Sequence, residues 1–484
     1  MSAFQEQQLA TDPWTSAWVS ANAGSGKTHV LVDRIARLLL DGSAPDRLLC
    51  LTFTRAAAAE MSTRLFGRLG TWTLIPDDEL AAELERLTGS DADELLLERA
   101  RRLFAEALES PGGLRIQTIH AFCERLLKRF PLEAGVVPQF SVLDERATEE
   151  LIDEAKDIVL REAASKDAAL ADAIAALTAY AGEERFDLLM RGIAGERAWV
   201  EAFFAQAPSL EATLKRSVGL DAAADERSIL DDATAALDPN ALARVVSALA
   251  RGSASDQKRA EVIRRFALER NRERFARFLD VFLTQEGERR SRLATKSVLE
   301  ADPAAAGLLE RFGDVAEQAR GRMNALFVAE TSGFLLTVAR AMLKAYEHLK
   351  SQRAVLDYDD LIAHAVGLFS SPGASWILYK LDGGVDHILV DEAQDTSPRQ
   401  WEIIKAIAEE FFAGKGAERE PRVVQRTVFS VGDTKQSIMS FQGARPASFA
   451  ETRLIIEQQA FGAKVDFARV PLVSSFRTAP RILQ

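Results

Sequence analysis

Residues 21–28, Ala-Asn-Ala-Gly-Ser-Gly-Lys-Thr, decide the fold class of this chain. They follow an apolar strand-like run (AWVS) and open a segment (THVLVDRIARLLL) whose apolar residues recur at helical spacing. A turn of small residues between a strand and a helix leaves backbone N–H groups free to bind phosphate. Gly24 and Gly26 allow the tight path, and the pattern Gly-x-x-x-x-Gly-Lys-(Ser/Thr) is met except at Ala21. The stretch therefore predicts a phosphate-binding loop.

The loop predicts ATP and Mg²⁺ as ligands. We expect Lys27 to reach the β- and γ-phosphates and the Thr28 hydroxyl to bind Mg²⁺. The other loop positions assigned to the nucleotide are Ala23, Gly24, Ser25 and Gly26. The alternative is a chance Gly-rich turn, which the preceding strand, the following helix and the Lys-Thr pair all disfavour.

A pair of carboxylates supplies the second half of the predicted chemistry. Asp391 and Glu392 follow the apolar run VDHILV, which is typical of a core strand in a parallel sheet. We expect Asp391 to hold the magnesium, directly or through water, and Glu392 to accept a proton from the attacking water. Adjacent carboxylates are common on solvated surfaces, but a buried charge must be paired or bind metal. Together the two motifs predict ATP hydrolysis.

The composition is that of a soluble globular protein. Of the 484 residues, 47% are hydrophobic and 27% charged, and the length suggests two or three domains. The chain has no run of 18 or more apolar residues and its N-terminus lacks a signal pattern, so we expect a cytoplasmic protein with no membrane partner. The two cysteines, Cys50 and Cys123, are expected to be buried free thiols.

Two sequence textures alternate along the chain. Short apolar runs such as LLCLTF, LRIQTI and TVFSV are separated by polar turns and helical segments, which indicates a parallel α/β sheet. Long stretches rich in Ala, Leu, Glu and Arg carry helical periodicity and few strand signals. The predicted fold class is α/β, a P-loop parallel sheet core with large all-helical insertions.

The net charge of −12 does not indicate a nucleic-acid partner, but charge distribution matters more than the total. Residues 258–277 contain eight basic and three acidic side chains on a helical stretch. A solvated helix face is the favoured interpretation, and a contact with the DNA backbone is the alternative.

Several further segments carry a family resemblance. They are 51–61 (LTFTRAAAAEM), 117–123 (QTIHAFC), 357–361 (DYDDL), 431–438 (VGDTKQSI) and 472–478 (LVSSFRT). With the phosphate loop, this series resembles the superfamily 1 helicases of the UvrD/Rep type, most closely the AddA and RecB branch that processes DNA double-strand breaks. The resemblance implies a RecA-like core and covers nearly all the α/β part, whereas the helical insertions support it only in size and position.

The resemblance implies further residues at the nucleotide. Gln7 is similar to the family's adenine-reading glutamine, with Gln8 as the alternative register. Gln436 would sense the γ-phosphate or orient the water, and Arg477 would act as an arginine finger, unless it is an exposed arginine at a domain edge. Gln442 stands where the family has an arginine, which puts in doubt how strongly ATP and DNA binding are coupled.

The resemblance also implies a track for single-stranded DNA. Thr54, at a helix N-terminus, would bind a DNA phosphate, or be a plain helix cap. Thr118, His120 and Phe122 would lie along the strand, and Phe441 would stack on a base. On their own, His120 and Phe122 would be assigned to the core.

The implied domain organisation alternates motor and insertion segments. The first RecA-like motor domain takes residues 1–72, 112–144 and 355–468, the helical insertions take 73–111 and 145–354, and a second RecA-like domain begins at 469–484. Because the family continues beyond that point, we expect this chain to be part of a longer protein, binding nucleotide weakly and turning over little by itself.

The resemblance implies the N-terminal motor part of an ATP-dependent 3′-to-5′ DNA helicase for double-strand break repair. Its partners would be an AddB-like subunit together with single-stranded and duplex DNA. One alternative is a UvrD-like helicase without a nuclease. Another is a non-catalytic DNA-binding scaffold, although intact Lys27, Asp391 and Glu392 argue against it.

Overall fold

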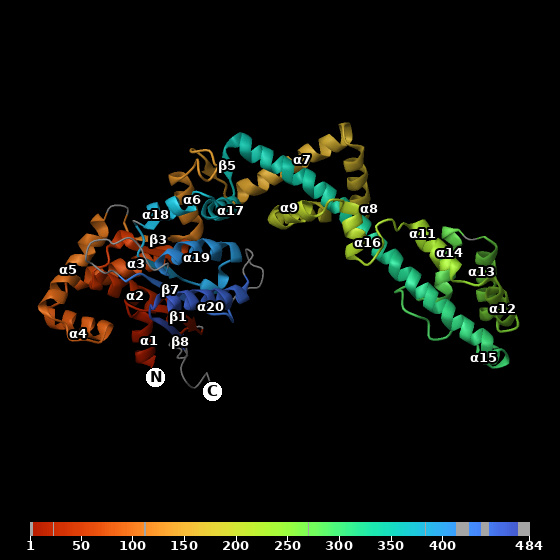
Figure 1. Cartoon of the computed structure of the whole chain (residues 1–484), viewed down its shortest axis with the longest axis horizontal. Coiled ribbons are helices and arrows are strands. Elements are labelled where there is room, and N and C mark those ends of the chain that lie inside the picture. Colours follow the sequence, from red (N-terminus) through yellow and green to blue (C-terminus); the bar gives the residue numbers. More distant parts are fainter. Residues whose placement is uncertain are drawn as a thin grey trace. The chain divides into compact units, whose positions relative to one another are not determined.

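The computed structural model describes residues 3–22, 24–110, 113–269, 271–382, 384–412, 425–436 and 445–472. The chain forms two compact units (Figure 1). The first contains residues 1–143 and 354–484, and the second contains residues 144–353.

The first unit is built on a six-stranded parallel sheet with the order β3-β2-β6-β7-β1-β8. Its strands are β1 (Ser16–Ala21), β2 (Leu48–Thr52), β3 (Arg115–Thr118), β6 (His387–Val390), β7 (Thr427–Gly432) and β8 (Phe467–Leu472). Strands β2, β6 and β7 are buried along their whole length, as expected of a parallel sheet covered on both faces. The predicted α/β fold with a parallel core is confirmed.

Helices cover both faces of this sheet (Figure 1). One face packs against α1 (Ala3–Thr11), α2 (Lys27–Asp41), α3 (Arg55–Trp72), α4 (Asp77–Thr88) and α5 (Glu94–Glu109). The other packs against α6 (Ile119–Arg129), α17 (Tyr358–Phe369), α18 (Ala374–Asp382), α19 (Pro398–Phe412) and α20 (Pro446–Ala463).

The alternation of side chains along β1 explains how one strand serves two cores. Ala17 and Val19 face the α1–α5 layer, whereas Trp18 faces the opposite layer. The Trp18 ring lies 5.6 Å from that of Trp401 and 4.7 Å from that of Phe449, centroid to centroid. The strand that leads into the phosphate loop is therefore fixed from both sides.

The chain leaves and re-enters the first unit at one place. Short strands β4 (Ser141–Val142) and β5 (Val355–Leu356) pair in parallel, with Ser141 opposite Val355. Residues 144–353, which lie between the two strands, form the second unit.

In the residues described, the second unit is helical apart from one isolated bridge between Leu283 and Arg289. Its helices are α7 (Glu145–Ser165), α8 (Ala168–Gly195), α9 (Arg197–Gln206), α10 (Leu210–Ser217), α11 (Glu226–Ala235), α12 (Pro239–Leu249), α13 (Ala254–Leu268), α14 (Arg272–Phe282), α15 (Lys296–Ala301) and α16 (Pro303–Arg353). Helix α16, 51 residues long, packs against most of the other helices of this unit.

Helix α16 is also long and apolar enough, by length and composition, to cross a membrane. Its most apolar 18-residue window has a mean hydropathy of 1.4 and is 39% buried within the structure. The central helix of a helical domain meets the same criterion, and α16 contacts α7–α12, α14 and α15.

Strand β8 crosses the boundary expected between the two motor domains at residues 468 and 469. Residues 469–472, which the sequence assigns to a second domain, pair with β1 in the first sheet. The register runs from Ser16 opposite Phe467 to Ala21 opposite Leu472. This sheet therefore extends at least to Leu472.

Candidate active site

The phosphate loop connects β1 to α2 with the backbone geometry that its glycines permit. Gly24 and Gly26 have φ values of 75° and 85°, which side chains with a Cβ rarely adopt. Gly26 is the N-cap of α2 and offers no side-chain acceptor to the first turn. The N–H groups at this helix end are therefore left for an anion.

Two side chains more than 300 residues away in the sequence meet Lys27 at this loop. The Lys27 Nζ atom lies 2.6 Å from Glu392 Oε2 and 3.5 Å from Gln436 Oε1. The Lys27 side chain is 11% exposed and that of Glu392 is 35% exposed, so the ion pair is partly shielded from solvent. Three of the predicted site residues are thus brought together.

Asp391 lies beside this pair in a more buried position. Its backbone N–H donates to the Leu51 carbonyl at 2.9 Å, and its Oδ1 accepts the Glu392 N–H at 3.0 Å. Burial, and then the Glu392 carboxylate, raise the pKa of Asp391 to about 6. A buried carboxylate with a raised pKa is a group that a bound cation would stabilise in its charged form.

Glu392 has a left-handed backbone with φ 45° and ψ 44°, an unusual conformation for a residue with a Cβ. Backbone strain of this kind costs roughly 1–3 kcal/mol and persists where the surroundings enforce it. Here the conformation follows directly after β6 and turns the carboxylate toward Lys27.

Gln394 connects the two segments that carry Glu392 and Gln436, although the sequence motifs predict no role for it. Its Nε2 donates to Glu392 Oε2 at 2.8 Å and to Asp395 Oδ2 at 3.0 Å. Its Oε1 accepts the Asp433 N–H at 2.8 Å, which is the start of the segment that leads to Gln436. The side chain is 1% exposed. The one feature of the sequence that could have identified Gln394 as a site residue is its position, two residues after Glu392.

The described residues fit ATP and Mg²⁺. The Ser25 hydroxyl is buried without a hydrogen-bond partner in the described part of the chain, inside a loop shaped for phosphate. Those residues also contain no group of three or more His, Cys, Asp or Glu side chains that could hold a metal alone. Mg²⁺ commonly binds through one or two protein groups together with nucleotide phosphates. Thr28 and Asp391 are the residues from which such groups are expected.

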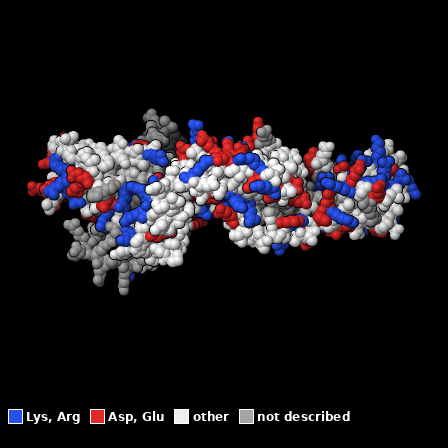
Figure 2. Space-filling model, turned by 90° about the horizontal axis from the view of Figure 1, so that it is seen from above, with Lys and Arg blue, Asp and Glu red and all other residues white. Residues whose placement is uncertain are grey.

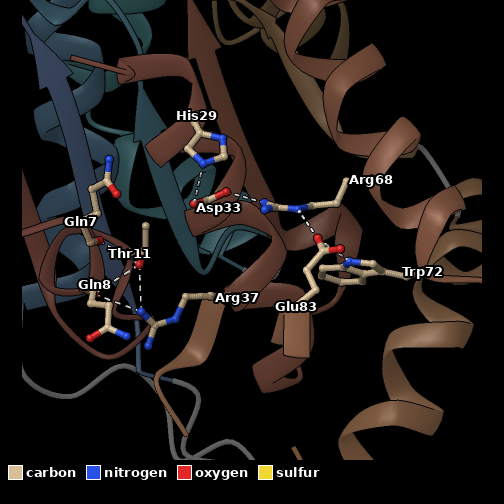
Figure 3. A network of polar contacts seen from close by, with 9 residues as sticks. All are labelled: Gln7, Gln8, Thr11, His29, Asp33, Arg37, Arg68, Trp72 and Glu83. Atoms are coloured by element: carbon tan, nitrogen blue, oxygen red, sulfur yellow. Dashed lines mark hydrogen bonds and ion pairs between the residues drawn. The ribbon is translucent and has the colours of Figure 1, made fainter. Parts of the chain in front are cut away.

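Helix α1 carries the two glutamines considered for the adenine. Figure 3 shows the Gln7 and Gln8 side chains pointing to opposite sides of this helix. The Gln8 amide lies against Gly89, where a Cβ would meet its Nε2 at 2.6 Å. Because Gln8 is used in this packing, Gln7 remains the better candidate for the base.

A charged network holds the nucleotide helix α2 to its neighbours (Figure 3). Arg68 of α3 pairs with Asp33 of α2, and its Nε donates to Glu83 of α4 at 3.1 Å. The buried Trp72 indole also donates to Glu83, at 2.9 Å. Helices α2, α3 and α4 are thus joined through one guanidinium, a link that no local pattern in the sequence predicts.

The two threonines expected to bind DNA phosphate are both helix N-caps. Thr54 Oγ1 accepts the Ala57 N–H at 3.0 Å, and Thr118 Oγ1 accepts the Ala121 N–H at 3.2 Å. They begin α3 and α6, which follow the adjacent strands β2 and β3. A helix start has four N–H groups without intrahelical partners, so each cap leaves donors that a phosphate could bind.

The two aromatic candidates on α6 have different surroundings. Phe122 is 6% exposed within the hydrophobic core, a packing that leaves no ring face for a base and favours the core alternative. His120 lies 5.1 Å from the Tyr358 ring, and Tyr358 is 36% exposed. Burial lowers the pKa of His120, which favours a neutral ring. Tyr358 is a candidate contact that the sequence motifs did not identify.

The remaining sequence motifs divide between packing and regions not described. Asp357 and Asp360 form a reciprocal capping box at the start of α17, with both N–H to carboxylate distances 2.9 Å. Ala23, Phe441 and Arg477 lie outside the described residues.

The basic stretch 258–277 is largely neutralised within the second unit. Six of its arginines pair with carboxylates: Arg259, Arg264, Arg265, Arg272, Arg274 and Arg277. Both Arg264 and Arg265 contact Glu261. These pairs favour the solvated-face interpretation over a dedicated DNA contact.

Comparison of the sequence with those of known proteins identifies the family of this chain. The chain is 29% identical to the ATP-dependent helicase/nuclease A subunit of Desulforudis audaxviator, over 96% of the chain and 38% of that relative. The same-named proteins of Lactobacillus gasseri and Listeria monocytogenes are 25% and 24% identical over 99% and 96% of the chain. The chain spans about two-fifths of the length of these relatives. Residues 1–453 match the UvrD/REP helicase N-terminal domain, and the chain belongs to that family.

Proposed function

We propose that this chain is the N-terminal motor part of an ATP-dependent 3′-to-5′ DNA helicase that acts in double-strand break repair and recombination. The observation that carries the proposal is the meeting of Lys27, Glu392 and Gln436 at the carboxyl ends of β1, β6 and β7. Ligands of open parallel sheets bind at that edge. Family membership and the printed names of the relatives support the helicase assignment.

Each site residue has a proposed task. Lys27 binds the phosphates, Thr28 and Asp391 hold Mg²⁺, and Glu392 accepts the proton of the attacking water. Gln436 orients that water or senses the γ-phosphate. Bound Mg²⁺ supplies charge neutralisation at the phosphates. Gln7 is proposed to read the adenine, and Arg477 to stabilise the transition-state charge.

The proposed partners are DNA and a second protein of the same complex. Thr54, Thr118 and His120 lie near the carboxyl ends of neighbouring strands, which supports a single-stranded DNA track along that edge. The names of the relatives describe one subunit of a larger enzyme, which supports a partner of the AddB type. The name helicase/nuclease also favours the AddA-like alternative over a UvrD-like helicase without a nuclease.

The test compares wild type with Lys27→Ala, in MgATP binding and in ATPase activity with and without single-stranded DNA. Wild type is expected to bind MgATP, and Lys27→Ala to bind at least tenfold more weakly and to lose any DNA-stimulated turnover. Equal binding and equal turnover in the two proteins would remove the motor proposal and favour the non-catalytic scaffold.

A further inference from the structure

We propose that a basic-aromatic strip on the first unit binds single-stranded DNA beyond the track at the sheet edge. The strip consists of Arg115, Arg125, Arg129, Trp376 and Lys380, and the buried Phe130 ring lies beneath it. It rests on the proposed function, because it names a second surface for the DNA that the motor would hold. Figure 2, seen from the side on which α6 and α18 lie in Figure 1, shows Lys and Arg side chains gathered on this unit.

The first observation is a group of arginines brought together by two elements. Arg125 and Arg129 are exposed and lie one turn apart on α6, so they share a face of that helix. Arg115 comes from the edge strand β3 and donates to the Gly384 carbonyl at 3.0 Å. Burial lowers the pKa of Arg115, and the charges of Arg125 and Arg129 lower it further despite the opposing Asp46. Arg125 and Arg129 are therefore both close enough to Arg115 to repel its charge.

The second observation is the lack of ion pairs around them. Within the described part of the chain, none of these three arginines has a carboxylate oxygen within 4.0 Å. Arg125 contacts the Gln117 amide instead. The arginines of α13 and α14, by contrast, are paired almost throughout. In a chain of net charge −12, a group of neighbouring arginines that forms no ion pair with the described residues points to an external anion.

The third observation is that aromatic rings continue the arginine group. The Arg129 guanidinium carbon lies 5.4 Å from the Phe130 ring centroid, and the Phe130 and Trp376 centroids are 5.6 Å apart, edge to face. Lys380 Nζ lies 5.7 Å from the Trp376 ring centroid. Trp376 is 48% exposed. Phe130 is 4% exposed, so Trp376 is the ring that a base could reach, and it lies between the arginine group and Lys380.

This combination fits unpaired nucleic acid better than a duplex. Guanidinium groups match phosphate geometry, and an exposed ring stacks on any base that is not already stacked in a helix. The strip is also continuous with the proposed track, because α6 carries His120 in its first turn and Arg129 at its last residue. The helix is about 16 Å long, the length of a few nucleotides.

The experiment measures binding of fluorescent oligo-dT to the 484-residue chain across a salt series, without nucleotide. Arg125→Gln/Arg129→Gln is expected to weaken binding about tenfold at low salt. It is also expected to flatten the slope of log K against log salt by roughly 1.4, about 0.7 for each lost phosphate contact. The matched control, Arg264→Gln/Arg265→Gln, removes the same charge from arginines that are paired with Glu261, and should change neither value.

The aromatic part of the strip is tested separately. Trp376→Ala is expected to lower affinity roughly tenfold with an unchanged salt slope, and Trp376→Phe to retain most of it, because stacking needs a ring and no charge. Photocrosslinking with 5-iodouracil DNA is expected to label Trp376.

The outcomes separate the strip from the proposed function. DNA binding that survives in both strip variants, with no label on Trp376, overturns the strip and assigns it to another anion such as an acidic protein. A wild-type chain that binds neither MgATP nor DNA contradicts the proposed function itself.

Discussion

The Lys27 ammonium and the Glu392 carboxylate form an ion pair at the phosphate loop, with 2.6 Å between Nζ and Oε2. The residue that would bind the phosphates is therefore held by the residue that would activate water. In the proposed mechanism, Lys27 exchanges the Glu392 carboxylate for a phosphate when nucleotide binds, and Glu392 becomes free to accept a proton.

This pair predicts opposite effects for its two members. Lys27→Ala should weaken MgATP binding at least tenfold, because the loop loses its cation. Glu392→Gln should leave binding equal or tighter, since Lys27 is released, but lower hydrolysis by about 10²- to 10⁴-fold through loss of the base. Calorimetric titration with MgATP and single-turnover hydrolysis measure the two effects. A Glu392→Gln variant that hydrolyses ATP at the wild-type rate would exclude Glu392 as the base.

Gln394 is expected to position Glu392 and to link it to the segment before Gln436. Gln394→Leu should reduce kcat about 10- to 100-fold with little change in KM for ATP, because the nucleotide contacts remain while the base loses its orientation. Gly432→Ala should behave alike, since its Cβ would approach Gln394 Oε1 to 2.7 Å. Gln400→Leu is the control, because that buried amide accepts from the Ser397 N–H at 3.0 Å. If Gln394→Leu changes KM and leaves kcat intact, the positioning role is wrong.

Arg68 should contribute more to stability than a neighbouring arginine on the same helix. Arg68→Met leaves the partly buried Asp33 and Glu83 without their shared cation and should cost about 1–3 kcal/mol of unfolding free energy. Arg64→Met removes only an exposed pair with Glu60 and should cost less than about 0.5 kcal/mol. Urea denaturation measures the unfolding free energy of the two variants. Equal midpoints would show that the Arg68 network stabilises the fold no more than an exposed ion pair does.

The lowered pKa of His387 predicts that the stability of the fold depends on pH. Burial, and then the charges of Arg34 and Arg426, lower the pKa of His387 from 6.5 to about 3. The folded chain therefore stays unprotonated at this site while the unfolded chain takes up a proton below pH 6.5. Stability should fall as the pH drops from 6.5 toward 3, by up to about 1.4 kcal/mol per pH unit from this group.

Urea midpoints at about pH 7, 6 and 5 test the histidine, because they span the upper part of this window. His387→Asn should show a smaller decline than wild type, because the proton-linked difference is gone. His29→Asn serves as the control, since that side chain is 60% exposed. Parallel declines in wild type and His387→Asn would show that another group governs the acid sensitivity.

The elements of the sheet could be predicted from the sequence because their signals are local. The run AWVS before the loop is β1, VDHILV contains β6, and TVFSV lies within β7. A glycine turn at Gly24 and Gly26, and a carboxylate pair at the end of a strand, identify a nucleotide site without tertiary information. The proximity of Lys27 and Glu392 followed from both lying at carboxyl ends of parallel strands.

The contacts that hold the site were not predictable in the same way. Gln394 acts through the N–H of Asp433, and Arg68 through two other helices, so neither leaves a pattern of spacing. Phe122 has the same local sequence whether its ring faces DNA or the core, and only its packing with the α6 layer distinguishes them. Strand β8 has a weaker sequence signal, because Pro471 interrupts its apolar run and proline is tolerated only in an edge strand such as this one.

The short pair of β4 and β5 has a consequence for how the protein can change. The Ser141 N–H donates to the Ala354 carbonyl at 3.1 Å, and the Leu143 N–H donates to the Leu356 carbonyl at 2.9 Å. Residues 144–353 can therefore be regarded as one long insertion in the first unit, and the β4–β5 pair holds the two ends of that insertion together. The entropy of closing a loop grows only logarithmically, about 0.6 kcal/mol for each doubling of length. The helical unit can thus be lengthened, shortened or replaced by another insertion, while the sheet that carries Lys27 and Glu392 folds as before.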